Sequence, residues 1–91
     1  MGNYLKRRIP IGSMVWVVIA PPVPCYAVIL HNRGPANILL RTDLEDADTE
    51  DQIEAGQQEI IRSPNWFLAG QRLCVLRAAE GTATVVCTFS G

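Results

Sequence analysis

The sequence lacks an excess of charge of either sign. Eight Lys and Arg residues are balanced by nine Asp and Glu residues, which gives a formal net charge of −1. Proteins that bind nucleic acid usually gather phosphates with a positive excess, so nucleic acid is not an expected partner. The chain is also short, because 91 residues support only one hydrophobic core, and its 48% hydrophobic and 19% charged residues are typical of a single globular domain.

Cysteine and histidine are scarce. The three cysteines, Cys25, Cys74 and Cys87, are odd in number and contain no C-x-x-C motif, so neither a disulfide framework nor a zinc site is predicted. The single histidine, His31, is separated from Cys25 by about 20 Å if the segment between them is extended. No activating third group is recognisable, so we expect no enzyme activity and no cofactor. The thiols are expected to be small buried hydrophobes, which suits a reducing cytoplasm.

Long helices are missing as well. Residues 14–30 are almost continuously apolar, but Pro21, Pro22 and Pro24 interrupt any helix there, so no membrane span is expected. The polar stretch 43–58 lacks apolar residues at helical spacing. Only residues 49–52 resemble the start of a helix, which leaves room for one short helical turn.

The sequence contains instead a series of short β-prone runs separated by turn-forming residues. Strands are predicted at 14–20, 25–30, 36–42, just before Ser63, 71–78 and 83–89. The turn formers in 31–35 predict a hairpin that pairs 25–30 with 36–42. Residues 83–89 alternate cleanly, which predicts a half-buried antiparallel strand. The fold class is therefore all-β, a small antiparallel β-sandwich or jelly-roll-like barrel.

Two segments stand apart from these strands. Residues 1–12 are predicted to be an extended N-terminal arm before a single domain at 13–91, and the arm carries Lys6, Arg7 and Arg8. Residues 43–54 hold seven of the nine acidic residues and are predicted to be a solvated loop. The arm could contact the acidic loop of another copy, or it could be a frayed terminus.

Calcium binding is the other interpretation of the acidic loop. Asp46, Asp48 and Glu50 alternate as calcium ligands do. An EF-hand loop that starts at Asp46 would need a glycine where Asp51 stands and a glutamate where Gln57 stands. A solvated loop is therefore favoured, and no metal site is predicted.

The apolar residues exceed what one small core can hide. Both faces of the predicted strands at 15–20 and 26–30 are apolar, so the acidic loop, the arm or a partner subunit must cover the second face. A homodimer or homotrimer is favoured. Core burial is the alternative for each of the expected interface anchors, which are Trp16, Val18, Tyr26, Trp66 and Phe67.

Three stretches resemble a known class of proteins. They are VILHNRGPANILLRTD at 28–43, IEAGQQEII at 53–61 and AGQRLCVLRAAEGTATVVCTF at 69–89. Their order resembles that of small tailed-bacteriophage virion proteins of the head decoration or capsid cement type. The resemblance implies a non-enzymatic structural protein, made in the host cytoplasm and located on the capsid surface. Such a protein binds the major capsid protein at seams between subunits and stabilises the shell.

The resemblance also implies a role for the arm. Lys6, Arg7, Arg8, Ile9 and Ile11 would contact an adjacent capsid subunit, and deletion of residues 1–12 is expected to abolish shell binding while leaving the fold intact. The alternative function is a soluble ligand-recognition module that binds carbohydrate or peptide. Such a module would use Trp66, Phe67 and the acidic loop.

Overall fold

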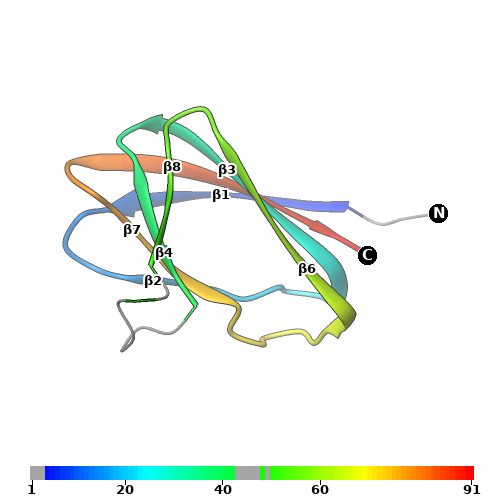
Figure 1. Ribbon diagram of the computed structural model, residues 1–91. Coiled ribbons are helices and arrows are strands. Elements are labelled where there is room, and N and C mark those ends of the chain that lie inside the picture. The colour runs from blue at the N-terminus through cyan, green and yellow to red at the C-terminus, as the bar shows by residue number, and fades with distance from the viewer. Residues whose placement is uncertain (1–3, 43–47, 49) are drawn as a thin grey trace.

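The computed structural model describes residues 4–42, 48 and 50–91, which form eight strands in two packed antiparallel sheets (Figure 1). Sheet A has the order β1 (Tyr4–Gly12), β8 (Thr82–Ser90), β3 (Cys25–Pro35) and β6 (Gln58–Phe67). Sheet B has the order β2 (Val17–Ile19), β7 (Cys74–Ala78), β4 (Ile38–Arg41) and β5 (Asp51–Ile53). The predicted all-β sandwich is therefore confirmed.

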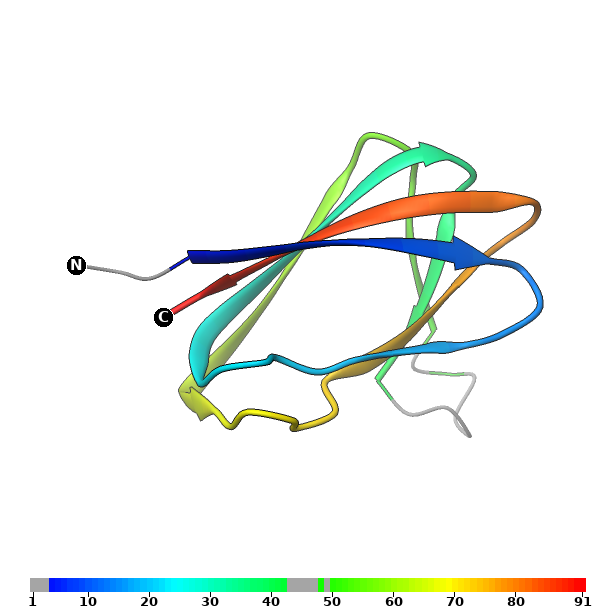
Figure 2. The same cartoon turned by 180° about the vertical axis from the view of Figure 1, so that it is seen from behind.

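The strand pairs are nested along the chain. β1 pairs with β8, β2 with β7, β3 with β6 and β4 with β5, and all four pairs are antiparallel. The pairs β3–β8 and β4–β7 complete the two sheets. The chain changes sheet at every connection except the one from β4 to β5, and Figure 2 shows this winding from behind. Four nested pairs rolled into two sheets form a jelly roll.

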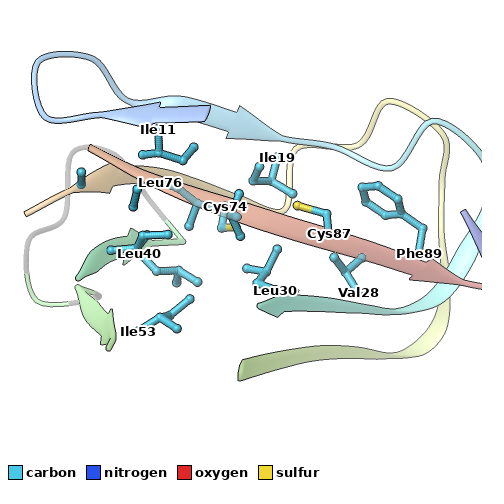
Figure 3. Close-up of a cluster of buried hydrophobic side chains, with 14 of the residues drawn as sticks. Ile11, Ile19, Val28, Leu30, Leu40, Ile53, Cys74, Leu76, Cys87 and Phe89 are labelled. Carbon is cyan, nitrogen blue, oxygen red and sulfur yellow. The ribbon is translucent and has the colours of Figure 1, made fainter. Parts of the chain in front are cut away.

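The core lies between the sheets and is built by residues that alternate along the strands. On β8 the inward residues are Ala83, Val85, Cys87 and Phe89, as their spacing predicts. Residues from both sheets meet them, and the main ones are drawn in Figure 3: Ile11, Ile19, Val28, Leu30, Leu40, Ile53, Cys74 and Leu76. Because side chains alternate along each strand, the residues between these core positions point outward and form the outer faces of the two sheets.

The predicted hairpin between 25–30 and 36–42 is wrong. The first segment belongs to β3 in sheet A and the second to β4 in sheet B, so the two do not pair with each other. The buried side chain of Asn32 organises the corner, because its Nδ2 donates to the carbonyl oxygens of Ala36 and Ile53 at 2.9 and 2.8 Å. Its Oδ1 accepts from the N–H of Gly34 at 2.7 Å. These bonds satisfy backbone groups at the corner and on β5.

The predicted N-terminal arm at 1–12 is also wrong over its described part. Tyr4–Gly12 forms β1 and pairs with β8 along its whole length, from Tyr4 opposite Ser90 to Gly12 opposite Thr82. Ile11 is buried in the core, and Leu5 and Ile9 pack against it. An apolar residue at alternate positions makes this segment an amphipathic strand. Deletion of residues 1–12 would therefore remove a strand of the domain itself.

The predicted acidic loop at 43–54 contains a strand. Asp51–Ile53 forms β5, and the buried Ile53 side chain anchors it to the core. The proposed helix start at residues 49–52 is wrong for Asp51 and Gln52, which are extended and pair with β4. Of the three residues considered as calcium ligands, Asp46 lies outside the described residues, whereas Asp48 and Glu50 are described.

Candidate functional site

The outer face of sheet A collects basic side chains. Lys6 and Arg8 lie on β1, His31 and Arg33 on β3, and Arg62 on β6. Each alternates with residues that face the core, so the side chains of all five lie on the solvent side of the sheet. We refer to these five residues as the basic face.

A groove of about 560 Å³ crosses this face. The strand register brings its walls together, because Lys6 lies opposite Thr88, and His31 lies between Val86 on one side and Gln58 on the other. The lining residues are Lys6, Ile29, His31, Arg33, Gln58, Val86 and Thr88. Ammonium, guanidinium, amide and hydroxyl donors thus surround two aliphatic side chains. Such a surface accepts an anionic group next to an apolar one.

No carboxylate occupies an outward position of sheet A among the described residues. The acidic residues lie elsewhere: Asp51 is on β5, and Glu50 accepts from the Nε of Arg41 at 2.8 Å. Glu59 lies on β6 opposite the buried Leu30, which places its side chain on the inner side of the sheet. Although the net charge of the chain is −1, the outer face of sheet A therefore has basic residues and no carboxylate among its described residues.

The basic triplet predicted for the arm is divided by this geometry. Lys6 and Arg8 belong to the basic face, whereas Arg7 alternates with them and lies on the other side of β1. Of the two apolar residues predicted beside the triplet for contact with a capsid subunit, Ile11 is buried in the core and Ile9 is partly buried against it. Neither isoleucine is free for a partner.

His31, Arg33 and Arg62 were not predicted from the sequence to be members of one surface. A signal was present in 28–33, where Val28, Leu30 and Asn32 alternate with Ile29, His31 and Arg33. That alternation marks one face as polar. It does not reveal that β1 and β6 bring further cations to the same face, because these pairings are non-local.

The five predicted interface anchors have different environments. Phe67 is buried in the core, so its assignment to an interface is wrong. Val18 is 53% exposed on β2. Tyr26 and Trp66 are 48% and 46% exposed, and their ring centroids lie 3.6 Å apart. These two rings form an accessible aromatic pair beside the junction of β3 and β6.

Trp16, the fifth predicted anchor, covers the outer face of sheet B. Its ring lies 4.8 Å from the guanidinium carbon of Arg41 and 5.0 Å from that of Arg77. Both distances fall within the range of cation–π attraction. Val75, which alternates with core residues on β7 and pairs with Val18 and Arg41, is only 2% exposed. Intramolecular contacts therefore occupy much of the Trp16 ring.

The three cysteines are free and buried. Burial raises the pKa of the Cys74 thiol to about 12, with a smaller contribution from the neighbouring Cys87, and it raises the pKa of the Cys87 thiol to about 11. Burial also raises the pKa of Cys25. Cys87 faces the core (Figure 3), whereas His31 faces the groove on the other side of sheet A. Neutral thiols separated from the imidazole by the sheet cannot form a thiolate–imidazolium pair.

The described part of the chain contains no group of three or more His, Cys, Asp and Glu side chains arranged to hold a metal ion. None of its segments is a helix of the length and apolarity needed to cross a membrane. Comparison with known proteins gives no match to a family model, to a curated protein or to a solved structure.

Proposed function

We propose that this protein is a non-catalytic structural domain that docks through the basic face onto an acidic surface of a larger protein assembly. The observation that carries the proposal is the groove of about 560 Å³ in a face that has cations on three strands and no carboxylate among its described residues. Complementary charge steers association and fixes orientation, and the aliphatic floor adds contact area.

A major capsid protein is the partner that we propose for this face. The resemblance to head decoration proteins supports this choice, and so does the fold class, because double-sheet jelly rolls occur in viral capsid proteins. Docking at repeated seams of a shell requires only moderate affinity at each contact, since many copies act together. A rigid sandwich that bridges two shell subunits stabilises them without any chemistry.

The decisive experiment compares two double variants with equal changes in charge. Lys6→Glu with Arg8→Glu reverses two members of the basic face. Arg7→Glu with Arg72→Glu reverses two exposed cations outside it. Co-sedimentation with purified tailed-phage capsid shells measures binding. We expect the first variant to bind about tenfold more weakly and the second to bind as the unchanged protein does, with binding reduced by salt.

The same variants also separate the possible partners. A short poly-L-glutamate peptide serves as a general acidic probe, and an oligonucleotide of equal charge serves as its competitor. Binding to the peptide that depends on Lys6 and Arg8 supports docking on an acidic protein. A clear preference for the oligonucleotide would contradict it. Equal loss in both double variants would show that only net charge matters.

One observation favours a second function, the recognition of carbohydrate or peptide. The rings of Tyr26 and Trp66, whose centroids lie 3.6 Å apart, are each about half exposed and offer an accessible aromatic surface, and jelly rolls also occur in lectin domains. Phe67 takes no part in this version, because it is buried. A sugar or peptide that binds the pair would change the fluorescence of Trp66 in the unchanged protein and would not bind after Trp66→Ala.

A further inference from the structure

The two edges of sheet A differ in how they are protected. β1 presents three consecutive cations, Lys6, Arg7 and Arg8, and then Pro10, which has no N–H to donate. Charges and proline are the usual means of preventing an edge strand from pairing with another chain. β6 has no proline over residues 58–62, and its two charged residues there, Glu59 and Arg62, have opposite signs, so this edge has no run of like charges.

The free backbone groups of the β6 edge follow from its pairing with β3. The N–H of Asn32 donates to the carbonyl oxygen of Gln57 at 3.0 Å, so the carbonyl group of Gln57 points toward β3. Hydrogen-bonded positions alternate along an antiparallel ladder, so Glu59 and Ile61 bond to β3. The N–H and C=O groups of Gln58, Ile60 and Arg62 therefore point away from the sheet.

The side chains of the same residues suit self-pairing. Ile60 is 46% exposed on the outer face, although it lies in the middle of a regular strand. In an antiparallel pair centred on Ile60, each Ile60 lies opposite its counterpart, and Gln58 of each copy lies opposite Arg62 of the other. The amide oxygen of Gln58 can then accept from the guanidinium of Arg62, and no like charges oppose each other.

We propose that β6 pairs with β6 of a second copy, so that the two sheets A form one continuous antiparallel sheet around a two-fold axis at Ile60. In this register Gln58, Ile60 and Arg62 of each copy all donate and accept backbone hydrogen bonds. A register centred on Ile61 also keeps the faces aligned, but it sets Pro64 opposite Gln58 and loses a donor on each side. Pairing centred on Ile60 is therefore preferred.

This inference is independent of the proposed docking function. It concerns the backbone edge of β6, whereas docking concerns the outer face of the sheet. The dimer nevertheless presents two basic faces on the same side of one sheet. A second copy thus doubles the cationic surface that faces a docking partner, and each basic face keeps the same kind of contact that it makes alone.

The test measures the native mass by light scattering over protein concentrations from micromolar to millimolar. The unchanged chain is expected to approach twice its 10.0 kDa mass as its concentration rises. Ile60→Lys introduces like charges at the two-fold axis and is expected to remain a monomer. Val18→Lys is the matched control, because Val18 is an exposed β-branched residue on the edge strand β2, and this variant is expected to dimerise normally.

A second variant distinguishes loss of strand pairing from misfolding. Ile60→Pro removes an N–H that points away from β3, so it preserves the internal ladder and is expected to fold as a monomer. Hydrogen exchange of the unchanged chain is expected to show protection of the Gln58, Ile60 and Arg62 amides that increases with concentration. A chain that stays monomeric throughout would overturn the proposal. So would a dimer that survives Ile60→Lys or that Val18→Lys disrupts.

Discussion

Sheet A has strands of nine to eleven residues and leaves its outer face open, whereas sheet B has strands of three to five residues and covers part of its outer face with the Trp16 ring. The cations on these two outer faces differ in their contacts. Arg41 and Arg77 of sheet B lie against that ring, and Arg41 also pairs with Glu50. The cations of the basic face have no ion pair within the described residues.

This difference separates stability from recognition within one small domain. Arginines that lie on an aromatic ring and pair with a carboxylate stabilise the face they cover. Cations without such contacts contribute little to folding, and their charge remains available to a partner. Substitutions on sheet B should therefore change the free energy of unfolding, and substitutions on the outer face of sheet A should change binding.

The largest expected effect comes from breaking the link between the sheets. Asn32→Ala removes the two side-chain hydrogen bonds that tie β3 to Ala36 and Ile53 and a local one from the N–H of Gly34, and it leaves backbone groups without partners. We expect the free energy of unfolding to fall by about 3 kcal/mol. Urea denaturation followed by tryptophan fluorescence measures it.

Asn37→Ala provides the control for this prediction. Asn37 makes one side-chain bond, from the N–H of Ala55 to its Oδ1 at 3.2 Å, at an exposed position. We expect a loss of less than about 1 kcal/mol. Equal losses in the two variants would mean that the corner at Asn32 has no special role in joining the sheets.

Asn32 also shows where the sequence stops being informative. It lies close to Gly34 and Pro35, so the local pattern predicts a hairpin turn. Leu30 and Leu40 can be buried either by a hairpin or by a chain that crosses to the other sheet, and both residues are buried here. Only the non-local partners of each strand decide between them. By contrast, the alternation of 83–89 fixes which face of β8 is buried without any knowledge of its neighbours.

The candidate site was predictable only in part, for the same reason. Lys6 and Arg8 stand out in the sequence as a basic cluster, but assigning them to an arm ignored the alternation of Leu5, Ile9 and Ile11. The basic face additionally needs the register of β1, β3 and β6, which pairs residues far apart in the chain. Trp66 and Phe67 are adjacent in sequence, yet one is exposed and the other buried.

The second prediction concerns the interior between the sheets, to which sheet A contributes Cys87 and sheet B contributes Cys74 (Figure 3). Folding raises the pKa of these thiols to about 11 and about 12, above their usual range. Their stabilising contribution is therefore complete below pH 9 and is lost as pH rises toward 12. At pH 10 we expect a loss of about 1 kcal/mol from each thiol.

Thermal melts in reducing buffer at pH 8 and pH 10 measure this loss, and Cys74→Ala with Cys87→Ala is the comparison. The double variant is less stable at both pH values because its core has cavities, but its melting temperature should fall less between them. Equal falls in the two proteins would assign the alkaline loss to other groups, such as tyrosine and lysine.

The smallest expected effect compares the two outer faces directly. Trp16→Ala removes a partly buried ring that Arg41 and Arg77 contact, so the free energy of unfolding should fall by about 1.5 kcal/mol. Tyr26→Ala removes a ring that is 48% exposed and should cost less than about half as much. Urea denaturation of both variants gives the difference. If Tyr26→Ala is the more destabilising, the aromatic pair with Trp66 is part of the folded scaffold and is not a surface held ready for a ligand.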